Sequence, residues 1–362
     1  MKKLLFVTVA LLVSLLAACT DDEKPAISEI SALQSEENIS QSVSAEQTLN
    51  TEESEVSEKD EDSSAEQSEE QSEEDDVLLR SDENSEWKYN VYRSYIELTE
   101  YIGEPVEKLV VPAEIEGLPV KVFGASIISG KDGCMPYGIR FTIKYLELPD
   151  TLEIIGAQAF DECCHLEEIK FPKGLLRIES TAFCGCVALK ELNLPEGLEY
   201  IGNGSFNYCK SLEKIVLPST VKNIGKRAFG LCLGLKKVTL PEGITVISEG
   251  AFDRCNALEE INIPSTVTAI EEGAFYCCHL QNVVLPCSVT SVGSEAFVNG
   301  YEYDSWDTLY TFISAPGVTL TVLNPDMKFG DKIGNPFEVR GYAGSTAEEY
   351  CRENGLKFAE IE

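Results

Sequence analysis

The chain has 362 residues, and its 62 acidic and 29 basic side chains give a formal net charge of −33. This acidic balance argues against nucleic acid as a partner. The charge is unevenly spread, because residues 20–86 hold 24 acidic and only 3 basic residues, whereas residues 87–362 hold 38 acidic and 24 basic residues. The composition therefore indicates two different kinds of segment, which are taken below in chain order.

The N-terminus has the layout of a secretory signal. Lys2 and Lys3 precede an apolar run over residues 4–16, which is shorter than the roughly 20 residues that a membrane-spanning helix needs. The residues LAAC, which end at Cys19, resemble the lipobox of bacterial lipoproteins, whose cysteine is lipidated. We predict a lipoprotein signal peptide over 1–18 and a protein exported and lipid-anchored through Cys19 to the cell membrane or outer surface of a bacterium. An ordinary cleaved signal is the alternative.

The next segment is dominated by Ser, Glu, Asp and Gln, and residues 20–86 contain no glycine and no aromatic residue. A chain with so little apolar surface cannot offset the entropy lost on folding. We therefore expect 19–86 to be a lipid anchor followed by a disordered acidic stalk. The alternative is an acidic tail that captures a basic partner or Ca²⁺, although the acidic residues lack the fixed spacing of a binding site.

A repeat begins near residue 106. The prolines that mark it follow one another at 23-residue intervals and, in the last case, at 22: Pro149, Pro172, Pro195, Pro218, Pro241, Pro264 and Pro286. Each ends a segment such as LEEIKFP or LKELNLP, which a second apolar pair and, in most copies, Ala-Phe-x-x-Cys follow. The period predicts stacked coils that share one core. Residues one and three positions before each proline should face inward in a parallel sheet, and those two and four positions before it outward.

The motif LxxIxLP followed by IGxxAFxxC resembles the BspA-like class of leucine-rich repeats, found in surface proteins of bacteria and some protists. The resemblance covers roughly 95–362 and implies a mostly β leucine-rich-repeat solenoid with short turns on its outer side. We expect an N-terminal capping repeat with an insertion over 87–142, regular repeats over 143–297, and a degenerate repeat and C-terminal cap over 298–362. In that cap, Ser345 should begin a short helix through Glu353 that covers the open sheet edge.

Cysteines recur three residues after the repeat phenylalanines, at Cys163, Cys186, Cys209, Cys232, Cys255 and Cys278. Stacking at about 4.7–4.9 Å permits disulfides by distance, but parallel side chains do not favour them. We expect a buried ladder of free thiols that act as small apolar groups. The pairing state of the other cysteines stays open: Cys134, Cys164, Cys184, Cys277, Cys287 and Cys351.

Catalytic and metal chemistry are not expected from these residues. The only histidines, His165 and His279, lie more than a hundred residues apart, and a row of thiols along a solenoid axis does not converge on one point. We therefore predict no enzymatic activity, no metal site and no cofactor.

Two surfaces are candidates for binding. The first is the column two positions before each proline: Lys170, Asn193, Val216, Thr239, Asn262 and Val284. Its mixed composition suits a protein contact, but it is also what any exposed β face looks like. The second is an aromatic cluster past the last regular repeat: Tyr301, Tyr303, Trp306 and Tyr310. Such rings suit sugars or a protein hot spot, and closure of the solenoid end is the alternative.

Anchor, stalk and solenoid together predict a surface-anchored binding or adhesion lipoprotein. Its partner would be an extracellular or cell-surface protein. The resemblance to BspA-like proteins implies adhesion to extracellular matrix proteins, which the residues themselves do not show. The alternative function is a carbohydrate-capturing surface lipoprotein that uses the aromatic residues of 301–312.

Overall fold

The computed structural model describes residues 77–127, 139–299, 301–302, 311–312, 318–334 and 338–361. These residues belong to the second of two compact units, which spans 69–362. The predicted signal peptide, Cys19, most of the stalk and Cys134 lie outside the described residues. Among the described residues, no helix has the length and apolar composition of a membrane span.

The folded unit begins with an antiparallel hairpin that leads into the first coil. Strands β1 (Arg80–Glu83), β2 (Trp87–Val91) and β3 (Ile96–Tyr101) pair in that order, and β3 then pairs in parallel with β6 (Leu118–Phe123). The short strand β5 (Glu114–Ile115) pairs with β6. Strand β1 lies in the last residues of the range 19–86 that composition assigns to the stalk, so strand pairing starts before residue 87.

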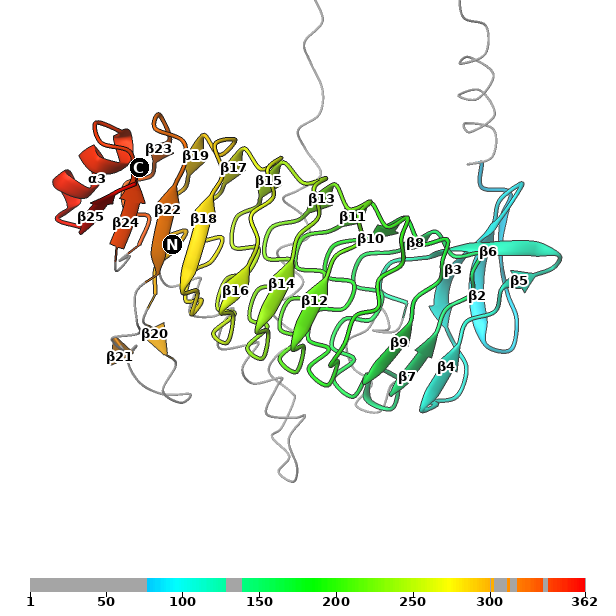
Figure 1. Cartoon of the computed structure of the whole chain (residues 1–362). Helices are drawn as coiled ribbons and strands as arrows, with labels where there is room; N and C mark the ends of the chain where they lie inside the picture. The colour runs from blue at the N-terminus through cyan, green and yellow to red at the C-terminus, as the bar shows by residue number, and fades with distance from the viewer. Residues whose placement is uncertain are drawn as a thin grey trace, which may run out of the picture. The chain divides into compact units, whose positions relative to one another are not determined.

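The segments before the prolines form a parallel sheet along one side of the stacked coils, here called the front sheet (Figure 1). Its strands are β4 (Lys108–Val110), β7 (Tyr145–Glu147), β9 (Glu168–Lys170), β12 (Lys214–Val216), β14 (Lys237–Thr239), β16 (Glu260–Ile261), β18 (Asn282–Leu285), β22 (Thr319–Val322), β24 (Glu338–Gly341) and β25 (Phe358–Glu360). Hydrogen bonding divides the front sheet into three blocks, β4-β7-β9, β12-β14-β16 and β18-β22-β24-β25. Between the first two, Glu191 and Lys214 make an isolated bridge.

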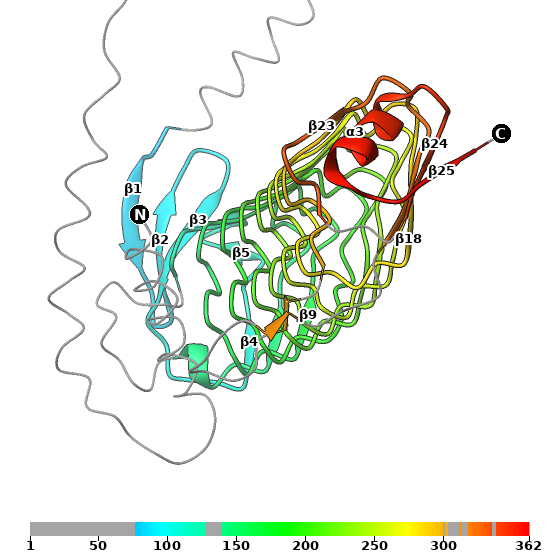
Figure 2. The same ribbon diagram turned by 90° about the vertical axis from the view of Figure 1, so that its left-hand side faces the viewer.

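The second apolar pair of each coil forms short parallel strands on another side of the coils, here called the back sheet (Figure 1), and Figure 2 shows the coils stacked behind one another. Hydrogen bonding divides the back sheet into two blocks. After β6 its strands are β8 (Ile154–Ile155), β10 (Arg177–Ile178), β11 (Tyr200–Ile201), β13 (Asn223–Ile224), β15 (Val246–Ile247), β17 (Ala269–Ile270), β19 (Ser291–Val292) and β23 (Lys328–Phe329). Neighbouring coils approach closely after these strands. A Cβ on Gly225 would lie 2.5 Å from the backbone nitrogen of Asn203, so a side chain at residue 225 would require this backbone to shift.

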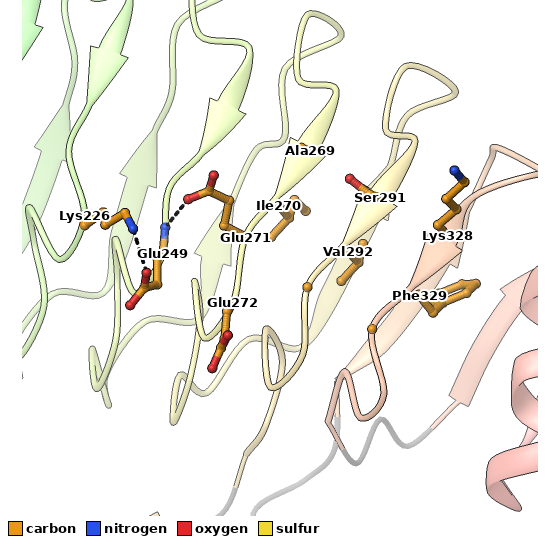
Figure 3. A pocket seen from close by; sticks show the side chains of 12 residues that line it. Lys226, Glu249, Ala269, Ile270, Glu271, Glu272, Ser291, Val292, Lys328 and Phe329 are labelled. Atoms are coloured by element: carbon orange, nitrogen blue, oxygen red, sulfur yellow. Dashed lines mark hydrogen bonds and ion pairs between the residues drawn. The ribbon is translucent and has the colours of Figure 1, made fainter. Parts of the chain in front are cut away.

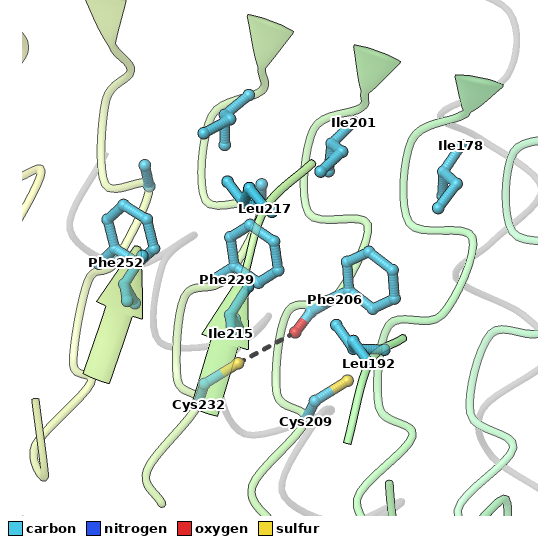
Figure 4. Packing of buried hydrophobic residues seen from close by; sticks show 14 of the residues in the cluster. Ile178, Leu192, Ile201, Phe206, Cys209, Ile215, Leu217, Phe229, Cys232 and Phe252 are labelled. Carbon is cyan, nitrogen blue, oxygen red and sulfur yellow. Dashed lines mark hydrogen bonds between the residues drawn. The ribbon is translucent and has the colours of Figure 1, made fainter. Parts of the chain in front are cut away.

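Aromatic rings fill the core between the two sheets. From Phe160 to Phe275 the repeat phenylalanines stack with ring centroids 5.2–5.7 Å apart and planes within 3–6° of parallel. The ladder cysteines lie beside this stack and are at most 3% exposed. From the second of them on, each thiol donates to the carbonyl oxygen of the phenylalanine in the preceding coil, as Cys232 does to Phe206 at 3.3 Å (Figure 4). Each thiol therefore fills space and also satisfies a buried backbone acceptor.

The C-terminal helix α3 (Thr346–Asn354) has the predicted caps. The Ser345 hydroxyl accepts from the backbone N–H of Glu348, and Gly355 has the left-handed φ of 66°. Tyr350 stacks on Phe329 of β23 at 4.6 Å, and its hydroxyl accepts from the backbone N–H of Ile333. The expectation that this helix covers the sheet edge is wrong for the front sheet, because β25 follows the helix and becomes the last strand there.

Candidate binding face

The outward side of the front sheet, here called the front face, carries the predicted column in the expected orientation. Lys170, Asn193, Val216, Asn262 and Val284 are exposed, and Thr239 is half-buried. The residues one and three positions before each proline are buried or half-buried. This alternation confirms the inward and outward positions predicted for the strands.

Several apolar side chains of the front face are open to solvent. Val110, Val216 and Val284 are 52%, 52% and 53% exposed, and Tyr145 is 42% exposed. All four stand on strands of the front sheet, namely β4, β12, β18 and β7. They give the face apolar contact points at intervals along the coils.

The N-terminal part of the front face is held by ion pairs. Glu147 lies 2.7 Å from the ammonium of Lys170 and 2.9 Å from that of Lys108. Hydrogen bonds from these two lysines, Lys170 first, lower the pKa of Glu147 to about 2. Lys170, one of the predicted binding residues, is therefore engaged with a neighbouring coil.

Charges on the front face balance. Two and four positions before the prolines, from β4 to β18, the basic residues are Lys108, Lys170, Lys214 and Lys237, and the acidic ones are Glu147, Glu168, Glu191 and Glu260. The rest are Val, Tyr, Asn and Thr. These strand positions are thus electrically neutral, whereas residues 87–362 as a whole carry a net charge of −14 from 38 acidic and 24 basic residues.

A depression of about 510 Å³ lies in the front face at the boundary of two blocks of the front sheet. Its lining consists of Lys237, Val238, Thr239, Glu259, Glu260, Ile261, Asn262, Gln281 and Asn282. It includes two residues of the predicted column, Thr239 and Asn262. The sequence did not predict that these residues line a depression, although the change from a 23-residue to a 22-residue proline interval at Pro286 marks the place.

Asn262 has a structural contact in addition to its surface position. Its Oδ1 accepts from the backbone N–H of Leu240, and its Nδ2 donates to the carbonyl of the same residue, each at 2.8 Å. The side chain thus binds both polar groups of one residue in the preceding coil. The backbone of β16 pairs with that of β14, and the Asn262 side chain extends this pairing by one more residue.

A second depression, of about 530 Å³, lies over the back sheet (Figure 3). Glu271 stands there at the coil position that Gly225 and Gly293 occupy elsewhere, and its carboxylate accepts from the backbone N–H of Glu249 at 2.9 Å. The Glu249 carboxylate lies 2.9 Å from the ammonium of Lys226. Several charged groups of this depression therefore already bind one another, and the front face is the better candidate.

Three of the four residues of the predicted aromatic cluster, Tyr303, Trp306 and Tyr310, lie outside the described residues. Tyr301 belongs to β20 (Tyr301–Glu302), which pairs antiparallel with β21 (Thr311–Phe312). The binding role of this cluster stays a prediction.

None of the described cysteines forms a disulfide. Outside the ladder, Cys164, Cys277 and Cys351 are buried, Cys184 is half-buried and Cys287 is exposed. The described residues also hold no group of three or more His, Cys, Asp or Glu side chains arranged to hold a metal ion.

Stacked coils with a strand before each proline define a leucine-rich-repeat solenoid, and comparison with known proteins narrows the class. The model of the BspA type Leucine rich repeat region matches residues 139–255 and 176–304. A Leucine Rich Repeat protein of T. pallidum is 31% identical over 60% of this chain and 88% of that chain, with a TM-score of 0.48. A leucine-rich repeat protein from Bacteroides ovatus is 22% identical over 79% of this chain and 76% of that chain, with a TM-score of 0.52.

A search of curated proteins finds no match. Residues 139–304 match repeats of the BspA type, and the described coils have the leucine-rich-repeat fold. These matches confirm the predicted type of repeat and the solenoid fold. The lipoprotein signal stays a prediction.

Proposed function

We propose that this chain is a non-catalytic interaction protein of the cell surface that presents its front face to an extracellular protein. The observation that carries the proposal is the neutrality of the front face together with its exposed valines, in a chain that is otherwise acidic. Charges that a partner covers must be desolvated, and an uncompensated charge costs most, so a protein interface favours charges that balance. A face whose charges balance and that offers apolar contact points loses the least free energy to desolvation when a partner covers it.

Anchoring completes the proposal. Lipidation of Cys19 attaches the chain to the membrane, and the acidic segment up to about residue 76 separates the solenoid from it. Adhesion is the activity that this arrangement supports, because a tethered repeat surface can engage a partner outside the cell. Replacement of Cys19 by serine tests the anchor. We expect loss of labelled palmitate from the protein and its release into the medium, and unchanged labelling would contradict lipidation.

The front face is tested by the adhesion of cells that display the full chain to surfaces coated with extracellular matrix proteins. Val216→Lys places a charge at the centre of the face and should weaken binding about tenfold or more, as truncation of an interface hot spot does. Asn223→Lys is the matched control, because Asn223 is exposed on β13 of the back sheet. Equal binding by wild type and Val216→Lys, or equal losses in both variants, would contradict the proposed face.

A further inference from the structure

The coil that ends at Pro286 has 22 residues, one fewer than each of the coils that end at Pro172 to Pro264. The difference lies in one turn, where the preceding coil reads CNAL over 255–258 and this coil reads CHL over 278–280. In the regular coil, Leu258 donates its N–H to the Cys255 carbonyl at 2.9 Å. Within the described part of the chain, the N–H of Leu280 makes no corresponding bond to Cys278. The missing residue therefore removes the turn that normally begins a front strand.

Loss of this turn separates two strands of the front sheet. In the preceding coils, Glu259 donates its N–H to Lys236 at 3.1 Å, and Lys236 donates its own to Glu213 at 2.9 Å. Among the described residues, β16 pairs only with β14 and β18 pairs only with β22. Two strand edges thus face each other without a ladder, and the depression of about 510 Å³ lies between them. The backbone donors and acceptors along these edges are open to a ligand that enters the depression.

Side-chain amides surround these edges. Asn262 shows within this fold how such an amide binds a peptide group, because it contacts both the N–H and the carbonyl of Leu240 at 2.8 Å. Gln281 and Asn282 stand on the opposite side of the depression and are exposed. Neither side chain makes a hydrogen bond to another described residue. Their donors and acceptors are available to a second peptide chain in the same way.

Apolar contact points lie on either side of the amides. Val216 on β12 and Val284 on β18 are separated by the two strands β14 and β16. Two of the three intervals are ladder spacings of about 4.8 Å. The third crosses the break, where no ladder holds the strands at that spacing, so the two valines lie more than roughly 14 Å apart. An extended peptide advances about 3.3 Å per residue, so side chains four residues apart are roughly 13 Å apart and point the same way. A peptide lying across the strands therefore reaches both valines with side chains that point the same way and stand four or more residues apart.

We propose that the break between β16 and β18 binds an extended peptide segment of an extracellular protein. Two apolar residues of that segment, an even number of positions and at least four apart, contact Val216 and Val284, and Gln281 and Asn282 bind the main chain between them. The inference rests on the proposed function and names the kind of partner segment it requires. A sugar is less suited to this groove, because its described lining contains no aromatic ring on which a sugar could stack.

The test restores the regular period in the full-length protein. Insertion of one alanine between His279 and Leu280 copies the turn of the preceding coil and should let β16 and β18 pair. The matched control is His279→Asn, which changes the same turn without adding a residue. A phage library of random 12-residue peptides is selected on wild type, and the selected peptides are measured on both variants.

We expect the selected peptides to share two apolar residues that are separated by an even number of positions, at least four. Their affinity should fall about tenfold or more on the insertion variant and remain unchanged on His279→Asn. In a double variant, Gln281→Ala with Asn282→Ala, the affinity for the peptides should fall by a similar factor. If the insertion variant does not fold, this double variant tests the proposed groove. Thermal unfolding checks the folding of each variant.

Three results would overturn the inference. They are a library without peptides enriched above background, enriched peptides that bind the insertion and amide variants as tightly as wild type, and a glycan array on which sugars bind wild type but not the insertion variant. Cell adhesion separates this failure from that of the proposed function. If Val216→Lys abolishes adhesion but the insertion and amide variants keep it, the front face is supported as the binding surface and the peptide groove is contradicted. If none of the variants affects adhesion, both the proposed function and the groove are contradicted.

Discussion

The core side and the front face of the same coils follow opposite rules. At the core, phenylalanine recurs at one position from Phe160 to Phe275, and each ring stacks on its own copy in the next coil. On the front face, the equivalent column changes from lysine to asparagine, valine and threonine. A buried side chain must fit the copy above and below it, whereas an exposed one has solvent on one side. Repetition in this chain therefore marks packing, and variation marks the surface where specificity can arise.

The largest expected effect tests this difference directly. Phe229→Ala removes one ring from the middle of the stack, between Phe206 and Phe252 at 5.5 and 5.7 Å, and should lower the free energy of unfolding by about 3–5 kcal/mol. Val216→Ala on the front face should change it by no more than about 0.5 kcal/mol. Urea denaturation followed by circular dichroism measures both. Similar losses in the two variants would contradict the division between core and face.

Much of this division can be predicted from the sequence, because a 23-residue period places each residue in a phase. The inward positions of the front strands, the stacked phenylalanines and the caps of α3 follow from that phase and from local capping rules. The back sheet is less predictable, because its two-residue strands have too little pattern to identify. Each of these strands pairs with the equivalent two residues of the neighbouring coil, which the stacking of the coils places beside it.

The candidate site was predictable only in part. The column that contains Val216 and Val284 follows from the alternation of the strands. The groove between β16 and β18 does not, although the 22-residue interval is visible in the sequence. A single missing residue can be absorbed in a loop or can break a ladder, and only the hydrogen bonds of the turn decide which occurs. The sequence likewise predicts only that Asn262 is exposed, and it does not predict the hydrogen bonds of its side chain to Leu240.

A smaller effect distinguishes the thiols of the core from those of the surface. Cys232→Ala removes one of two donors to the Phe206 carbonyl, which also accepts from the backbone N–H of Cys209, and opens a small void. The free energy of unfolding should therefore fall by about 1–2 kcal/mol. Cys287 is exposed, and Cys287→Ala should cost no more than about 0.5 kcal/mol. In native protein a maleimide should label Cys287 and leave Cys232 unmodified until denaturant is added. Labelling of both at the same rate would show that the ladder is open to solvent.

The smallest effects depend on pH, and they have opposite signs at the core and at the face. Burial, aided by the charge of Glu162, raises the pKa of Asp161 from 3.8 to about 6, although the Cys184 thiol and Arg140 act in the opposite direction. The folded state therefore holds more protons than the unfolded state between about pH 4 and 6, and stability from this group falls as pH rises through that window. Asp161→Asn should remove this decrease in stability with rising pH and make the protein more stable than wild type at pH 7.

Glu147 on the front face provides the opposite case and the control for Asp161. Its ion pairs with Lys170 and Lys108 lower its pKa to about 2, so its contribution is present above about pH 4.5 and is lost as pH falls toward 2. Glu147→Gln should therefore reduce stability at pH 7 slightly, because these side chains are exposed to solvent and salt. Urea midpoints measured from pH 3 to 8 check both variants. If Asp161→Asn and Glu147→Gln shift the midpoint at pH 7 in the same direction, the two carboxylates do not differ in the way that their positions require.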